Sequence, residues 1–297
     1  MDGRETWSRY WASGQTHSCF AGGQPFDTGF VWKGFFDALA PGARVLDLAC
    51  GAGALTRLAV AHSHGFTVTG ADYAQALAPV AGARLVAGAA LEALPFESDV
   101  FDAAISQFGL EYADTRAALR EAARVLAPGG QLGVLAHARD GEAVAAARTR
   151  IARAASLIAP DGLAAQVRAL GEARARGQDE SPVLERVRRL FAEEAARTLD
   201  ETTHWAMSFL AEILNKKDRF PPPYLIENAQ TVLDEVSAHS ARLTLMTDAS
   251  LDETAARALA EAARAAGLST GGPESVHDSA GRPVGWWLHG ELSPSSR

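Results

Sequence analysis

The sequence contains few cysteines and no long apolar run. Its 297 residues include two cysteines, Cys19 and Cys50, which are too few for a disulfide framework and favour a protein of the reducing cytoplasm. No apolar stretch reaches the roughly 18 residues that a membrane-spanning helix needs. The charged segment Met1–Tyr10 does not have the pattern of a signal peptide. We therefore expect a cytoplasmic protein that does not insert into membranes.

The sequence also has no excess of positive charge. It carries 28 Lys and Arg against 36 Asp and Glu, a net charge of −8 at pH 7. Nucleic-acid binding depends on basic surfaces, so no nucleic-acid partner is expected. His62 and His64 are two residues apart, a spacing that does not align two ligands on a helix, and no metal site is expected.

Short apolar runs alternate with segments of helical periodicity between residues 44 and 137. Near-continuous apolar runs are typical of strands in a parallel sheet that is covered on both faces. The alternation predicts an α/β fold, a Rossmann-like, doubly wound and mostly parallel sheet. The expected strands are Arg44–Leu48, Thr67–Ala71, Phe101–Ser106 and Gln131–Ala136, with a weaker one at Arg84–Ala87, and the expected helices are Ala54–His64 and Thr115–Leu126, the second ending before a tight turn at Pro128–Gly130.

Two flanking regions differ from this core. Residues 1–36 hold nine of the 22 aromatic residues, and they either pack onto the sheet or form a lid whose rings line a ligand pocket. Residues 141–250 have helical character and form a cap or insert. We expect four segments: an aromatic lid at 1–40, the core at 41–140, the helical insert at 141–250, and a return to the core sheet at 251–297.

Three patterns in the C-terminal half are informative. Trp205, Phe209 and Ile213 form an apolar stripe of helical spacing, which is either core or the wall of a substrate cavity. Arg242–Thr247 is compatible with a strand or a buried helical turn. A helix is predicted at Asp252–Ala266, and a last strand at Val284–Leu292.

A glycine turn follows the first predicted strand. In Val45–Thr56 the glycines Gly51 and Gly53 allow a ligand to approach the backbone closely, and Asp47 stands at the strand's end, where open α/β sheets bind ligands. The next strand ends at Asp72, whose carboxylate could accept hydrogen bonds from both hydroxyls of a ribose. The third glycine of a dinucleotide fingerprint is replaced by Thr56, which disfavours a nicotinamide cofactor.

These residues resemble a known family. Val45–Thr56 followed by Asp72 looks like the first two motifs of the class I S-adenosylmethionine-dependent methyltransferases, specifically the ubiquinone/menaquinone-type and natural-product subgroup. Glu92–Phe96, Phe101–Ser106 and Val125–Gly130 are similar to the later motifs in order and spacing. The resemblance covers roughly residues 40–138.

The resemblance implies a cofactor site for S-adenosyl-L-methionine, with S-adenosyl-L-homocysteine as product. Ala49–Gly53 would cradle the methionine portion, Asp72 would hold the ribose next to Tyr73, Ala90 and Leu91 would face the adenine, and Ser106 and Gln107 would line the sulfonium. Ala49 replaces a motif glycine. Ala90 replaces an acid that accepts a hydrogen bond from the adenine amino group, so we expect weaker discrimination of adenine.

Methyl transfer requires mainly that a nucleophile is aligned with the S–CH₃ bond, and a base assists some acceptors. His137 follows a predicted strand, and the ordinary pKa of a histidine lies near neutral pH, which makes it the first candidate base. The alternative is a histidine that is only hydrogen-bonded at a strand end. Glu111 is a second candidate, its alternative being an exposed or helix-capping acid.

The N-terminal aromatic segment is the expected closure over the cofactor. Tyr10 could donate to the methionine carboxylate, while Trp11 shields the sulfonium. The residues expected to contact the acceptor are Trp11, Phe108, Tyr112, Trp205 and Phe209.

The sequence therefore predicts methylation of a small, partly apolar organic acceptor on O, N or C by a monomer or homodimer. Two other functions stay open. One is C-methylation that triggers carbocation rearrangement or cyclisation, and the other is a non-catalytic nucleoside-binding regulatory protein.

Overall fold

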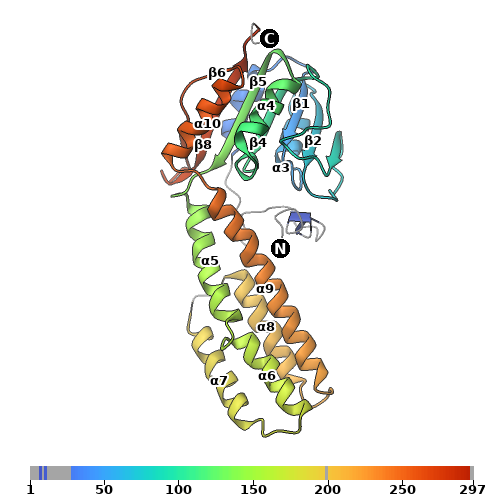
Figure 1. Cartoon of the computed structure of the whole chain (residues 1–297), viewed down its shortest axis with the longest axis vertical. Coiled ribbons are helices and arrows are strands. Elements are labelled where there is room, and N and C mark those ends of the chain that lie inside the picture. The colour runs from blue at the N-terminus through green and yellow to red at the C-terminus, as the bar shows by residue number, and fades with distance from the viewer. Residues whose placement is uncertain (1–6, 9, 12–27, 198–199, 295–297) are drawn as a thin grey trace. The chain divides into compact units, whose positions relative to one another are not determined.

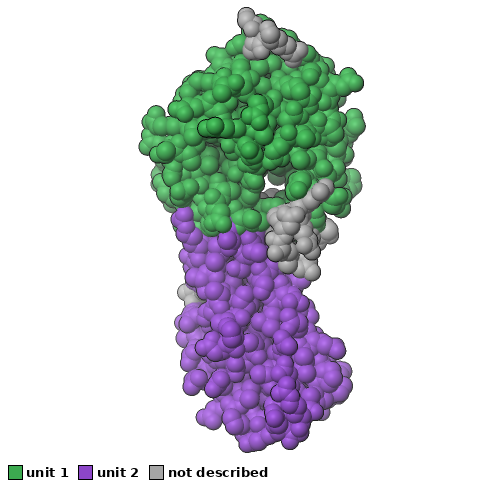
Figure 2. Space-filling view, in the orientation of Figure 1, with its two compact units in different colours: residues 1–145, 245–297 green, residues 146–244 purple. Residues whose placement is uncertain are grey.

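The structure is a computed structural model that describes residues 7–8, 10–11, 28–197 and 200–294. Most of the predicted N-terminal aromatic segment, including Cys19, lies outside the described residues. The chain divides into two compact units, coloured separately in Figure 2. Unit 1 comprises residues 1–145 and 245–297, and unit 2 comprises residues 146–244. The four-segment division with boundaries at residues 40, 140 and 250 stays a prediction.

Unit 1 is built on one mixed sheet with the strand order β3-β2-β1-β4-β5-β8-β6, and β7 pairs with β8 (Figure 1). The pairs from β3 to β5 are parallel, whereas β8 is antiparallel to β5, β6 and β7. The strands are β1 (Arg44–Leu48), β2 (Thr67–Asp72), β3 (Ala83–Ala87), β4 (Phe101–Gln107), β5 (Leu126–His137), β6 (Leu268–Thr270), β7 (Glu274–His277) and β8 (Pro283–Leu292).

Helices cover both faces of this sheet. On one face, α2 (Gly29–Ala38) and α3 (Ala54–Val60) pack in a cluster that includes Trp32, Phe35 and Trp287. On the other face, α4 (Thr115–Val125) and α10 (Glu253–Ala265) supply mostly Ala and Leu. Burial on both faces explains why the strands read as apolar runs, and the predicted Rossmann-like fold class is confirmed.

Two of the predicted boundaries in unit 1 are wrong. The expected helix Ala54–His64 ends at Val60. Beyond it, His62 contacts Asp37 of α2, and His64 contacts the carbonyl of Leu39 at the end of α2, so these two histidines leave the helix. The turn expected at Pro128–Gly130 lies inside β5. There the pairing with β4 shifts from Phe101–Leu126 to Ala103–Gln131, so the turn residues form an irregularity within the strand.

Unit 2 is helical. Its core joins buried residues such as Leu157, Val167, Leu210 and Val232 from successive helices. The segment Arg242–Thr247, for which two structures were open, is helical. The helices that lie in unit 2 or enter it are α5 (Glu142–Ile158), α6 (Leu163–Ala175), α7 (Ser181–Ala195), α8 (Glu201–Asn215) and α9 (Pro223–Ala249).

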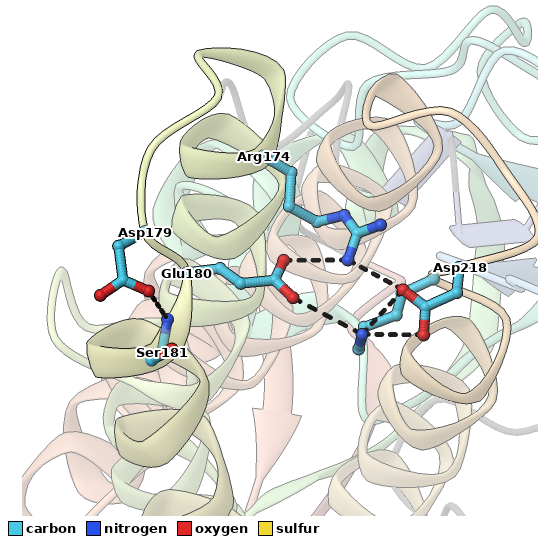
Figure 3. Close-up of polar contacts among 6 residues, drawn as sticks. Arg174, Asp179, Glu180, Ser181 and Asp218 are labelled. Atoms are coloured by element: carbon cyan, nitrogen blue, oxygen red, sulfur yellow. Dashed lines mark hydrogen bonds and ion pairs between the residues drawn. The ribbon is translucent and has the colours of Figure 1, made fainter.

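An ion-pair network links three segments of unit 2 (Figure 3). Arg174 near the end of α6 contacts Glu180, the N-cap residue of α7, at 2.9 Å and Asp218 after α8 at 3.1 Å. Lys217 contacts the same two carboxylates at 3.7 and 2.9 Å. Two cations and two anions therefore alternate in a closed ring.

None of the helices in the described part of the chain combines the length and the apolar character that crossing a bilayer requires.

Candidate active site

The chain reverses its direction across the sheet at β1. From β1 the chain adds β2 and β3 on one side, and then returns to place β4 and β5 on the other side. Ligands of open α/β sheets bind at the carboxyl ends of the strands at such a switch point. The structure has a cavity of about 510 Å³ there. Its lining residues, all in unit 1, are Trp7, Trp11, Ala49, Asp72, Tyr73, Ala90, Leu91, Glu92, Phe108, Gly109, Tyr112, Ala113 and Leu245.

The turn after β1 has the left-handed backbone that its glycines predict. Gly51 has φ 51°, Gly53 has φ 80°, and Ala49, which lines the cavity, has φ 56°. A Cβ atom at Gly51 would lie 2.6 Å from Cζ2 of Trp11, so the indole of Trp11 lies against the backbone of the turn. The lack of a side chain at Gly51 therefore permits close approach to the backbone, and in this structure it is the Trp11 indole that makes this approach.

Asp72 at the end of β2 both lines the cavity and holds the turn. One carboxylate oxygen accepts the N–H of Gly51 and the other accepts that of Ala74, each at 2.8 Å. Burial raises the pKa of Asp72, and these two hydrogen bonds oppose the rise. Each carboxylate oxygen can accept a second hydrogen bond, so the group retains the capacity to bind two hydroxyls.

Asp47 is placed differently from Asp72. It is 1% exposed and does not line the cavity, and its Oδ2 accepts the hydroxyl of Thr56 at 2.6 Å. Burial raises its pKa to about 7, the hydrogen bond from Thr56 lowers it, and the charge of Asp72 adds to the rise. Its predicted contact with a cofactor stays a prediction.

The loop after β3 forms another wall. Ala90, Leu91 and Glu92 line the cavity, and Tyr73, 42% exposed, lies at its margin. Oε1 of Glu92 accepts the N–H of Asp114 at 2.9 Å, which ties this loop to the segment after the short helix η1 (Leu110–Tyr112).

Aromatic rings line a further part of the cavity. Trp7 stacks on Trp11 with centroids 5.7 Å apart and meets Tyr112 edge-on at 5.4 Å. Phe108, at φ 55°, also lines the cavity. Tyr10 does not line the cavity; it packs edge-on against Trp11 at 4.9 Å. The structure thus brings together three of the predicted acceptor-contacting residues, Trp11, Phe108 and Tyr112.

Ser106 and Gln107 do not line the cavity. The Ser106 hydroxyl is fully buried, donates to the Leu48 carbonyl at 2.9 Å and accepts the N–H of Leu110 at 3.1 Å. Gln107 accepts the indole N–H of Trp32 at 2.6 Å. Successive residues of a strand point to opposite faces, and both side chains are engaged in holding the fold. Their predicted place beside the sulfonium stays a prediction.

His137 and Glu111 form a buried pair. Oε1 of Glu111 lies 2.7 Å from His137 Nδ1 and accepts the His137 backbone N–H at 2.9 Å, while Oε2 of Glu111 is buried without a partner. The alternative interpretation of Glu111 as an exposed acid is wrong, because η1 turns its side chain inward. The His137 ring lies behind Phe108, stacked at 4.3 Å, and does not line the cavity. This geometry favours the interpretation in which His137 is only hydrogen-bonded at the end of a strand. Catalysis by His137 or by Glu111 stays a prediction.

Trp205 and Phe209 belong to unit 2 and are not among the lining residues. They stack on each other at 5.9 Å; Trp205 is 40% exposed, whereas Ile213 of the same stripe is buried. Their contact with an acceptor stays a prediction. Among the described residues, no group of three His, Cys, Asp or Glu side chains is arranged to hold a metal ion.

Five lining residues had no predicted role. Trp7 lies in the N-terminal aromatic segment and Glu92 in the motif Glu92–Phe96, so the sequence pattern could have identified both as site residues. Gly109 faces Ala49 so closely that a Cβ atom would come within 2.5 Å of the alanine methyl. Ala113 and Leu245 have no local signal, because only the folded chain brings them to the cavity.

The comparisons with known proteins agree with this site. Residues 46–134 match the family described as methyltransferase domain. The chain therefore contains a class I S-adenosylmethionine-dependent methyltransferase domain, which includes the turn after β1, Asp72 and the loop after β3.

The particular relatives are matched over this region only. The chain is 45% identical over 98 residues to demethylmenaquinone methyltransferase of Corynebacterium kroppenstedtii, covering 32% of this chain and 42% of the relative. It is 43% identical over 97 residues to that of Mycolicibacterium paratuberculosis, covering 32% and 41%. The chain thus spans about two fifths of these relatives. A solved S-adenosylmethionine-dependent methyltransferase of Mesorhizobium loti is 29% identical, covering 36% of this chain and 54% of that chain, with a TM-score of 0.31.

Proposed function

We propose that this protein transfers a methyl group from S-adenosylmethionine to a small, partly apolar organic acceptor. The observation that carries the proposal is the cavity of about 510 Å³ at the switch point of the sheet, whose lining combines the carboxylate of Asp72 with several aromatic rings. A cavity of this size lies within the range that small molecules and cofactors occupy.

The residues present fit the cofactor. Asp72 has acceptor capacity left for two ribose hydroxyls, Ala90 and Leu91 offer an apolar surface to the adenine, and the turn at Ala49–Gly51 allows close approach of the methionine portion. When bound, the cofactor supplies a methyl group that is already activated by its sulfonium.

The chain's own residues then position the acceptor and exclude water. Trp7, Trp11, Phe108 and Tyr112 present flat apolar surfaces that can hold a ring or chain against the methyl group. Alignment of this kind contributes roughly 7–11 kcal/mol to lowering a barrier. Aromatic faces also favour the positive charge that the reaction carries.

The acceptor of the demethylmenaquinone methyltransferases is not carried over to this protein. The matched region, residues 46–134, holds all of the lining residues that we assign to the cofactor, and of those that we assign to the acceptor it holds Phe108 and Tyr112. Trp7, Trp11 and Leu245, which also line the cavity, lie outside it. The similarity therefore supports the cofactor more strongly than the acceptor.

The aromatic wall also supports a second candidate, C-methylation that triggers carbocation chemistry, because aromatic faces stabilise cations. Product analysis separates the two functions. A product that differs from its acceptor only by one methyl group supports simple transfer, and a rearranged or cyclised skeleton supports the second candidate.

A thermal-shift screen tests the cofactor assignment. S-adenosylmethionine and S-adenosylhomocysteine should each stabilise the protein by about 2.7 kcal/mol at 100 times the dissociation constant, and NAD should not. Stabilisation by NAD alone would overturn the proposal.

A gain-of-function variant tests the adenine wall. Ala90→Asp introduces a charged acceptor next to Leu91, and one hydrogen bond to a charged group strengthens S-adenosylhomocysteine binding about tenfold. Ala93→Asp, at an exposed position of the same loop that does not line the cavity, is the matched control and should leave the affinity unchanged. Equal effects of both variants in calorimetric titrations would contradict the assigned orientation of the cofactor.

A further inference from the structure

The charges in the cavity restrict the chemistry of the acceptor. Of the described residues that line it, the two that are charged at neutral pH in their ordinary state are the carboxylates Asp72 and Glu92. Asp72 lies at the end of β2 and is engaged with the turn after β1. Glu92 lies in the loop after β3 and is exposed. An anionic group entering the cavity would be repelled by both carboxylates, and a cationic group would be attracted.

Glu92 lies next to the aromatic wall. Its Oε1 accepts the N–H of Asp114, the residue that follows Ala113. Tyr112 and Ala113 line the cavity at this point, so the carboxylate of Glu92 and the ring of Tyr112 border the same region. With Oε1 bonded to the backbone, Oε2 is available to a ligand.

The rings near Glu92 add to the preference for positive charge. The ring of Trp7 is nearly perpendicular to that of Tyr112, with an interplanar angle of 87°, and nearly parallel to that of Trp11, with an angle of 17°. The rings that line the cavity therefore have two orientations. Aromatic faces from more than one direction, together with a carboxylate, are the arrangement by which proteins recognise ammonium groups.

We propose that the acceptor is an amine carried on an apolar, ring-bearing scaffold, and that the protein methylates its nitrogen. This inference rests on the proposed function and names its substrate class. Glu92 attracts the ammonium form, and Trp7 and Tyr112 hold the scaffold.

The reaction of an amine fits these charges. The acceptor loses one proton to solvent and attacks as the neutral amine. Its lone pair forms the N–CH₃ bond while the S–CH₃ bond breaks, and the sulfur keeps the electron pair of that bond. The positive charge moves from sulfur to nitrogen, so the aromatic wall and Glu92 face a cation before and after the transfer. A phenolate or carboxylate nucleophile would bring negative charge next to Asp72 and Glu92.

Ring-matched probes test the inference. Tryptamine, 3-ethylindole and indole-3-propionate share one ring and differ in charge, and phenethylamine, ethylbenzene and 3-phenylpropionate form a second set. Binding is measured by calorimetry to the full-length protein saturated with S-adenosylhomocysteine. We expect the amine of each set to bind about tenfold more tightly than the carboxylate, which corresponds to about 1.4 kcal/mol. With S-adenosylmethionine, mass spectrometry should find a methyl gain on the amines.

Two variants separate charge from shape. Glu92→Gln keeps an oxygen for the Asp114 N–H and removes the negative charge, so it should reduce the preference for the amine severalfold and leave the neutral probe's affinity unchanged. Glu97→Gln, an exposed residue after the same loop that does not line the cavity, is the matched control and should preserve the preference.

The outcomes distinguish this inference from the proposed function. If S-adenosylhomocysteine does not bind, the proposed function fails. If it binds and the amines do not outrank the carboxylates, including a result in which no probe binds, the inference fails alone. A preference for the amine that is undiminished in Glu92→Gln would also overturn it.

Discussion

The buried carboxyl of Asp47 makes the stability of unit 1 depend on pH. Its side chain is 1% exposed and its partner is the neutral hydroxyl of Thr56, so the ionised form lacks a compensating cation. Replacing it in Asp47→Asn keeps an oxygen that accepts the Thr56 hydroxyl and removes the charge. We expect this variant to be more stable than the wild type above neutral pH.

The magnitude follows from the pKa. Burial raises the pKa of Asp47 from 3.8 to about 7, so between these values the folded protein holds a proton that the unfolded chain has released. The resulting stability is fully present below pH 4 and is lost as the pH rises through 7. Since each tenfold change in a proton equilibrium is worth about 1.4 kcal/mol, the loss amounts to about 4 kcal/mol.

Thermal unfolding followed by circular dichroism from pH 4 to pH 8 measures the effect. Asp47→Asn should match the wild type near pH 4 and exceed its melting temperature by roughly 10 °C at pH 8, at 2–4 °C per kcal/mol for a unit of this size. Asp102→Asn is the control with the opposite sign, because the hydrogen bond from Arg44 lowers the pKa of Asp102. That variant should be less stable than the wild type at pH 8, and the difference should not grow as the pH falls. An advantage of Asp47→Asn that does not change with pH would refute the reasoning.

Two further variants test the backbone and the buried pair. Ala49→Gly relieves a left-handed backbone at φ 56° and should raise the free energy of unfolding by about 1 kcal/mol in urea titrations; a decrease would show that the methyl contact with Gly109 matters more. Glu111→Ala removes the carboxylate that His137 contacts and should lower the free energy of unfolding by about 3–5 kcal/mol. Glu111→Gln retains an acceptor and should lower the free energy of unfolding clearly less. Equal losses in the two variants would contradict a role for the hydrogen bonds.

The central strands could be predicted from the sequence because each is buried on both faces. Arg44–Leu48 is predicted with the bounds that the structure gives to β1. In contrast, β6 and β7 were not predicted, since they are short and mostly exposed, and residues such as Glu274 give no apolar pattern. The irregularity in β5 was missed for another reason: Pro128–Gly130 is typical of a turn, and only pairing with β4 on both sides of it makes the segment part of a strand.

The candidate site divides in the same way. Asp72 and the turn at Ala49–Gly53 were predictable, because their spacing along the chain determines their place at the edge of the sheet. Ser106 was predicted to line the sulfonium from the resemblance to a family motif, and no sequence pattern indicated the hydrogen bonds that its hydroxyl makes with Leu48 and Leu110. The burial of Glu111 depends on its pairing with His137, 26 residues away, and that contact has no local signature.

The place of β8 has a consequence for synthesis on the ribosome. Residues 131–137 of β5 pair with β8, which begins at Pro283. This edge of β5 therefore stays unpaired until about 150 further residues have been translated. At 5–20 residues per second the wait lasts roughly 8–30 s. During this interval, in which all of residues 146–244 are translated, β5 exposes unpaired N–H and C=O groups to other nascent chains. A stop codon before residue 283 would leave that edge permanently open, and the shortened product should aggregate.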